Sequence, residues 1–246
     1  MSIRCYLPPE EWCRTTVTLS GREAYHLSRV LRVTPGTVVT CFDGQGHEAP
    51  AQVRRVIRRE IQLELKERFE TPEPRCRITL GIAVPRHGRM DQIIDQATQM
   101  GVNRVAPLLT RRGVVKVSPE AMRKKQARWE QIAIEAGKQS GVSRIPVIQP
   151  VTPWAGLLPS LATTDCVLIA AIEGPHESLG QILSQGDPRH LLVLIGPEGD
   201  FTPEEIEEAA RAGAHRISLG PTVLRCETAV VASLTLVNFF LGKFFP

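Results

Sequence analysis

The chain has 246 residues, of which 42% are hydrophobic and 23% are charged, and its formal net charge is +4. This composition excludes a mainly disordered chain, and the chain is long enough for one large or two modest domains. An aromatic content of 5% argues against an RNA-binding sheet that stacks bases on aromatic side chains.

The first 75 residues are predicted to form a small β-rich domain. Residues 38–57 show two strand-like runs around the turn pair Asp43–Gly44, which is typical of a hairpin. Residues 61–69 alternate apolar and polar side chains, as a half-buried strand does. Residues 21–33 fit a short helix. Together these segments indicate a small barrel with one helix.

A change of pattern follows the prolines of residues 71–76, which we interpret as a linker between domains 1–72 and 76–246. Beyond it, strands and helices alternate, which predicts an α/β domain with a mostly parallel sheet. The expected strands are 77–84, 104–109, 145–148, 166–172, 191–195 and 216–219, and the expected helices are 90–101, 118–139, 203–212 and a last one from about 227.

Basic side chains are concentrated in residues 104–144, where ten basic and three acidic residues give a net charge of +7. Such a stretch is a candidate phosphate-binding surface. The alternative is a solvated helix face, because one amphipathic helical segment carries Arg123, Lys124, Lys125 and Arg128. The charge pattern leaves both interpretations open.

Three loops near the C-terminus each follow a predicted strand, at the edge where open α/β sheets bind ligands. They are Gly196–Gly199, Leu219–Pro221 and Val223–Thr228. After the first loop, Thr202 and Glu205 predict a capping box. There is no phosphate-binding G-x-x-x-x-G-K-S/T motif, so the pattern favours an adenosine-type ligand without a triphosphate. The alternative is that these glycines and prolines mark only turns.

The ordered string GPEG-x-F-T-x-x-E…LG-x-x-x-LR-x-ETA resembles the RsmE family of SPOUT RNA methyltransferases, which methylate N3 of a uridine in 16S ribosomal RNA. Residues 90–107, 110–113 and 128–146 also resemble the family. The resemblance implies an N-terminal PUA-like β-barrel that binds RNA and a C-terminal α/β domain with a trefoil knot. It further implies S-adenosylmethionine as cofactor, the small ribosomal subunit as partner, and a homodimer whose active site is completed across the interface.

Site residues follow from the same resemblance. The cofactor is expected to contact Glu173, Gly196, Pro197, Glu198, Gly199, Leu219, Gly220, Leu224, Arg225, Glu227 and Thr228. Arg225 is the candidate cation for a uridine anion or a phosphate, and Glu198 is the candidate base or hydrogen-bond acceptor. A loop-shaping role for Glu198, and helix capping by Glu227 and Thr228, are the alternatives. Arg111, Arg112 and Arg144 are expected to contact RNA phosphates.

The chain departs from the family pattern at several places: Asp200 stands where a second glycine is usual, and Gln96, Gln99, Val142 and Cys226 replace other usual residues. Two competing hypotheses therefore remain. One is a related methyltransferase acting on another RNA or nucleotide, and the other is an RNA-binding assembly factor without activity.

Cysteine and histidine usage adds expectations about environment. The six cysteines contain no C-x-x-C pair and favour a cytoplasmic protein with free thiols. The histidines lack metal-ligand spacing, so no metal is expected. The longest apolar run, residues 229–241, is shorter than the roughly 20 residues of a membrane span, and the N-terminus shows no signal-peptide pattern.

Overall fold

A computed structural model describes residues 2–86, 88–113 and 118–242. The chain divides into two compact units, one of Met1–Glu73 with Ile134–Ile145 and one of Pro74–Ala133 with Pro146–Pro246. The sequence-based domains 1–72 and 76–246 remain a prediction.

The first unit is built on a sheet with the strand order β1-β3-β4-β5-β2, in which β6 also pairs with β4. The predicted hairpin is confirmed, because β3 and β4 pair antiparallel on either side of Asp43 and Gly44. The predicted helix is also confirmed. It consists of α1 followed by a π-helical turn, and beyond that turn Arg32 has a left-handed φ of 51°. The small β domain is therefore a half-barrel with one helix. Its elements are β1 (Arg4–Tyr6), η1 (Pro9–Glu11), β2 (Thr16–Leu19), α1 (Gly21–Tyr25), η2 (His26–Val30), β3 (Val38–Phe42), β4 (His47–Ile57), β5 (Glu60–Leu65) and β6 (Phe69–Glu70).

The end of helix α3 (Pro119–Ser140) and the residues after it belong to this unit through buried polar contacts. Lys138 is nearly buried, and its Nζ lies 2.7 Å from Glu23 and 2.9 Å from Glu135. Farther on, the Ile145 N–H donates to the carbonyl of Gly44. This contact explains why the predicted strand 145–148 is shortened to β9 (Val147–Ile148).

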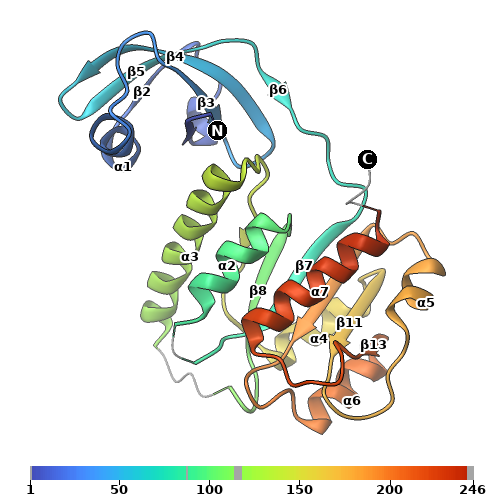
Figure 1. Cartoon of the computed structure of the whole chain (residues 1–246). Coiled ribbons are helices and arrows are strands. Elements are labelled where there is room, and N and C mark those ends of the chain that lie inside the picture. Colours follow the sequence, from blue (N-terminus) through green and yellow to red (C-terminus); the bar gives the residue numbers. More distant parts are fainter. Residues whose placement is uncertain (1, 87, 114–117, 243–246) are drawn as a thin grey trace. The chain divides into compact units, whose positions relative to one another are not determined.

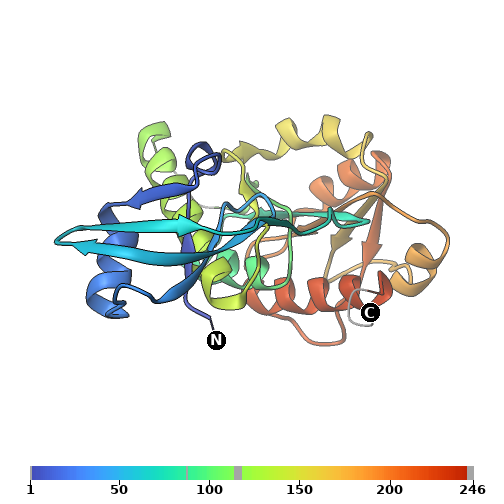
Figure 2. The same ribbon diagram turned by 90° about the horizontal axis from the view of Figure 1, so that it is seen from above.

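The second unit is a parallel sheet with the strand order β10-β8-β7-β12-β11-β13, and β9 pairs with β8 (Figures 1 and 2). The predicted α/β class is confirmed. Its remaining elements are β7 (Arg77–Ala83), α2 (Met90–Gln99), β8 (Arg104–Leu109), β10 (Thr152–Pro153), α4 (Trp154–Leu161), β11 (Cys166–Ala170), α5 (Leu179–Ser184), β12 (His190–Ile195), α6 (Pro203–Arg211), β13 (Ala214–Ile217) and α7 (Cys226–Phe240).

Helices cover both faces of this sheet, and alternate strand residues fill two cores. In β12, Leu191, Val193 and Ile195 belong to the core that includes residues of α2, α3 and α7. Leu192 and Leu194 belong to the other core, with residues of α4 and α6. This arrangement explains why β11 and β12 read as continuous apolar runs. In the described part of the chain, no helix is long and apolar enough to cross a membrane.

The sequence did not predict two short helices, α4 and α5. Helices α4 and α5 have only eight and six residues, and α4 contains Pro159, so neither shows a long amphipathic period. The predicted bounds 216–219 of the last strand are wrong by two residues: β13 begins at Ala214 and ends at Ile217. Leu219 therefore lies in the loop after the strand, where it can face a ligand.

Candidate active site at the carboxyl edge of the sheet

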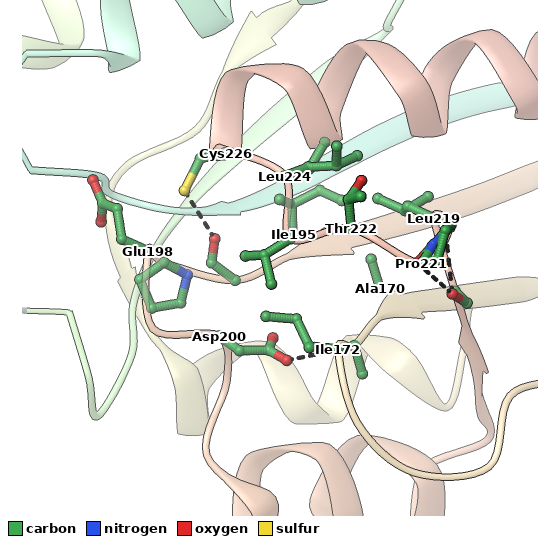
Figure 3. Close-up of a pocket in the computed structure, with 17 residues that line it drawn as sticks. Ala170, Ile172, Ile195, Glu198, Asp200, Leu219, Pro221, Thr222, Leu224 and Cys226 are labelled. Carbon is green, nitrogen blue, oxygen red and sulfur yellow. Dashed lines mark hydrogen bonds between the residues drawn. The ribbon is translucent and has the colours of Figure 1, made fainter.

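Three loops meet where neighbouring parallel strands end. Ile169 of β11 is in register with Leu194 of β12 and with Arg216 of β13, so the three strands finish at the same edge. The loops that follow enclose a pocket (Figure 3). Its lining comes from residues 170–172, 195–198 and 218–224, with Asp200, Cys226 and Ala229.

The loop after β12 is held by its own backbone. A Cβ on Gly196 would lie 2.9 Å from the Phe201 nitrogen, so only glycine fits there. The Asp200 N–H donates to the Pro197 carbonyl at 2.9 Å, and Asp200 has a left-handed φ of 62°. Aspartate tolerates this conformation better than most residues, which explains how it can replace a glycine.

The capping box that follows is confirmed. The Glu205 N–H donates to Thr202 Oγ1 at 3.3 Å, and Glu205 Oε2 accepts the Thr202 N–H at 2.9 Å. Glu205 is fully buried, and its Oε1 accepts the N–H of Arg111 at 2.8 Å. The box therefore ties the loop after β8 to helix α6 next to the pocket.

Cys226 begins α7 at the wall of the pocket. Its thiol donates to the Gly196 carbonyl at a sulfur–oxygen distance of 3.4 Å (Figure 3). Burial, together with the nearby negative charges of Glu198 and Glu227, raises the pKa of Cys226 to about 11. The side chain is a neutral thiol at physiological pH, which argues against a nucleophilic role.

The two glutamates near Cys226 have separate partners. Glu198 lines the pocket, and its Oε1 accepts the N–H of Arg86 at 3.2 Å. Glu227 is 13% exposed and lies 3.3 Å from Arg89. The capping role considered for Glu227 and Thr228 is wrong, because Arg225 is the N-cap of α7 and no side chain caps this helix.

Six of the eleven expected cofactor contacts line the pocket, namely Gly196, Pro197, Glu198, Leu219, Gly220 and Leu224. The other five lie around it. Glu173 and Gly199 line a neighbouring cavity that shares Ile172 and Asp200 with the pocket. Arg225, Glu227 and Thr228 lie in or beside the first turn of α7, next to the lining residues Leu224 and Cys226.

Sequence reasoning missed lining residues at the strand ends, such as Ala170, Ile172 and Ile195. Their only signal was position, since each lies at or just after the carboxyl end of a predicted strand. It also missed Asp200 as a lining residue, although the motif departure had singled it out.

The three arginines expected to contact RNA have partners within their own units. Arg111 lies 3.0 Å from Glu208 and 3.6 Å from Glu204, while Arg112 donates to the carbonyls of Gly199 and Phe201. In the first unit, the Arg144 side chain is 18% exposed and donates to carbonyls of the linker and the β3–β4 turn. Arg112 therefore also supports the loop that lines the pocket.

The lining chemistry fits a ligand with an apolar ring and a positive charge. Apolar walls come from Ala170, Ile195, Leu219 and Leu224, and Glu198 and Asp200 are the charged lining residues, both carboxylates. Pockets of this kind suit nucleoside ligands. Within the described residues, no group of three or more potential ligands could hold a metal ion.

Comparisons with known proteins agree with this architecture. Residues 71–238 match the model of the RNA methyltransferase domain family, and residues 19–66 match that of the RNA methyltransferase PUA domain. The ribosomal RNA small subunit methyltransferase E of Synechocystis is 31% identical over 98% of this chain and 78% of its own length. Its Bacillus subtilis counterpart is 27% identical over 91% of this chain and 90% of its own length.

A solved structure extends the likeness to three dimensions. The ribosomal RNA small subunit methyltransferase E of Neisseria gonorrhoeae, bound to S-adenosyl methionine, superposes with a TM-score of 0.86 at 28% identity, covering 97% of this chain and 98% of that one. A half-barrel with one helix, a parallel sheet and a pocket of three loops, matched over nearly the whole chain, place this protein in the RsmE family of SPOUT RNA methyltransferases.

Proposed function

We propose that the protein transfers a methyl group from S-adenosylmethionine to N3 of a uridine in the RNA of the small ribosomal subunit, in the cytoplasm. The observation that carries this proposal is the pocket at the carboxyl edge of the sheet. Its walls include residues of the three motif segments Gly196–Gly199, Leu219–Pro221 and Val223–Thr228, together with residues of the loop after β11. The assignment of small-subunit ribosomal RNA as substrate is supported by the names of the related proteins, and N3 of uridine is what the resemblance to the RsmE family implies.

The pocket residues bind and orient the cofactor. Gly196, Leu219 and Gly220 of these loops line the pocket wall, where the cofactor would contact them. S-adenosylmethionine, when bound, supplies a methyl group on a sulfonium with its leaving group attached. The protein must therefore align the acceptor with the methyl–sulfur bond and exclude competing orientations.

Uridine N3 carries a proton and is a poor nucleophile until that proton leaves. We propose that Arg225, which is exposed at the mouth of the third loop, stabilises the uridine anion or grips a neighbouring phosphate. Glu198 is the proposed base or hydrogen-bond acceptor. Glu173, Gly199, Glu227 and Thr228 would complete the cofactor surroundings, and Arg111, Arg112 and Arg144 would contact RNA phosphates.

We further propose a homodimer that uses the outer face of α7. Its inner face fills the core, but Leu236, Phe239 and Phe240 are 38%, 50% and 45% exposed. An apolar stripe of this kind on a helix that begins at the pocket is suited to an interface with a second copy.

The proposal is tested by mapping 3-methyluridine in small-subunit RNA by mass spectrometry. A strain lacking the gene should lose one such nucleoside, and the purified protein with S-adenosylmethionine should restore it on subunits from that strain. Restoration of a different modified nucleotide would identify another RNA target. Cofactor binding without any methyl transfer would support an assembly factor instead.

A further inference from the structure

The β4–β5 hairpin ends in a group of arginines that the proposed active site does not use. Arg54, Arg55, Arg58 and Arg59 lie within six residues, and all four are exposed. Between them, Val56 and Ile57 are 36% and 46% exposed. We call residues 54–60 the arginine arm. Because residues on both faces of the ribbon are exposed here, the core of the first unit does not cover the arm.

Most of the charge on this arm is uncompensated. Arg54 donates to Glu64, its neighbour across the hairpin, through Nε at 2.5 Å. In the part of the chain that the structure describes, no side chain pairs with Arg55, Arg58 or Arg59. Glu60 is the one acidic residue of the arm, so its net charge is +3. Clustered cations repel one another, and an anionic partner relieves that repulsion.

The residues of the turn indicate that the positive charge of the arm is favoured over the stability of the hairpin. Ile57 pairs with Glu60, so Arg58 and Arg59 form a two-residue loop. Arg58 takes a left-handed φ of 44°, a conformation that hairpin loops ordinarily give to glycine or asparagine. An arginine there works against the turn, as residues retained for binding often do.

We infer that the arginine arm docks on the phosphodiester backbone of the RNA substrate, an inference that rests on the proposed function. Guanidinium groups bind phosphate oxygens through paired hydrogen bonds, and a narrow two-stranded ribbon can follow a row of phosphates. The exposed Val56 and Ile57 would contact sugars or unstacked bases between those phosphates.

The test compares the wild type with the triple variant Arg55→Gln, Arg58→Gly and Arg59→Gln on in vitro-transcribed small-subunit ribosomal RNA across a range of salt. We expect at least about tenfold weaker binding at low salt and a slope of log affinity against log salt that is shallower by about 2. Thermal stability should hold or rise, because glycine suits the turn at position 58. A matched control replaces the exposed Arg75, Arg189 and Arg211 with Gln and should keep the wild-type slope.

Several results would overturn the inference. Unchanged affinity and slope in the triple variant would do so, as would an equal loss in the matched control, which would indicate a net-charge effect. Binding of the arm to anionic lipid vesicles, with RNA binding intact in the triple variant, would assign it to a membrane surface. Failure of the wild type to methylate any RNA would instead refute the proposed function.

A second, independent inference concerns Asp200. Its Oδ1 accepts the N–H of Phe201 at 2.7 Å. Its Oδ2 accepts the N–H of Ile172 at 2.8 Å, a bond that Figure 3 shows. Ile172 belongs to the loop after β11, whereas Asp200 belongs to the loop after β12, and both residues line the pocket. One carboxylate thus joins two walls of the same pocket.

A glycine at this position would provide the left-handed φ but no link to Ile172. We infer that Asp200 is a positioning residue that holds the two loops at a fixed separation and so keeps the pocket formed before the cofactor binds. Preorganisation of this kind improves affinity because less ordering occurs on binding. This inference also rests on the proposed function.

The variants Asp200→Gly and Asp200→Asn separate the link from the backbone conformation. Both residues tolerate a positive φ, but glycine loses both acceptors, while asparagine keeps one amide oxygen. We expect S-adenosylmethionine to bind the glycine variant at least about tenfold more weakly by calorimetry, with asparagine intermediate. Amide exchange at Ile172 should accelerate in the glycine variant without cofactor. Turnover at saturating cofactor should fall by a smaller factor than the cofactor affinity does.

The exposed Asp187, replaced by Asn, controls for net charge and should leave cofactor affinity unchanged. Wild-type affinity in the glycine variant would overturn the inference, and so would a fall in turnover at saturation as large as the fall in affinity. A wild-type protein that does not bind S-adenosylmethionine would refute the proposed function and not the link itself, which the exchange rate at Ile172 reports separately.

Discussion

Arg225 is exposed and lies beside the pocket, between the lining residues Leu224 and Cys226. Among the described residues, Arg225 forms no ion pair with Glu198 or Glu227. Glu227 pairs with Arg89. If Arg225 stabilises a charge that develops during the reaction, Arg225→Ala should lower single-turnover methylation by roughly 10²-fold, with little change in cofactor affinity. Lys should rescue little, because it lacks the planar fork. Cofactor affinity falling in proportion to the rate would contradict this role.

The Cys226 thiol makes a pH dependence testable. Its pKa in the folded protein, about 11, lies above the ordinary value of 9.0, so the folded state holds the proton more tightly. The resulting stabilisation is complete below pH 9 and is lost as the pH rises toward 11. We expect the melting temperature of the wild type to fall over this range more than that of Cys226→Ala. Iodoacetamide at pH 8.5 should label the exposed Cys13 and spare Cys226; rapid labelling of Cys226 would count against a buried thiol.

At the scale of elements, the basic stretch 104–144 is no uniform charged surface. Replacing Arg111, Arg112 and Arg144 together with Gln should weaken RNA binding and reduce its salt dependence. Because Arg112 and Arg144 also donate to backbone carbonyls, we expect the triple variant to melt at a lower temperature. Arg111→Gln alone loses only contacts with glutamates of α6, so it isolates the RNA contribution. An unchanged salt slope in the triple variant would leave the stretch as a solvated face.

At the scale of the whole molecule, we expect a homodimer at micromolar concentration. Replacing Phe239 with Glu puts a charge on the exposed face of α7 and should shift light-scattering mass toward the monomer, while the core face stays intact. The control Ala210→Glu adds the same charge at an exposed position of another helix, α6. A monomeric wild type would refute the dimer.

Local features of the fold were predictable from neighbouring residues. The hairpin at Asp43–Gly44, the capping box at Thr202 and the alternating strands depend on φ preferences and hydrogen bonds within a few positions. The loop motifs of the pocket are equally local, since Gly196–Gly199 and Leu219–Pro221 each follow the end of a strand within two residues and Val223–Thr228 leads into the last helix. For this reason the sequence by itself determined the α/β class, the edge that carries the pocket and six of its lining residues.

Contacts between distant residues needed the tertiary structure. Nothing near Glu227 indicates that it pairs with Arg89, 138 positions away, or that Asp200 reaches Ile172. Likewise nothing near Lys138 indicates that it pairs with Glu23, 115 positions away. Such pairings depend on which strands become neighbours and on where helices pack. The sequence determined the elements and the loop chemistry, whereas strand order and packing decided which charges meet, because side chains distant along the chain interact only once the fold brings them together.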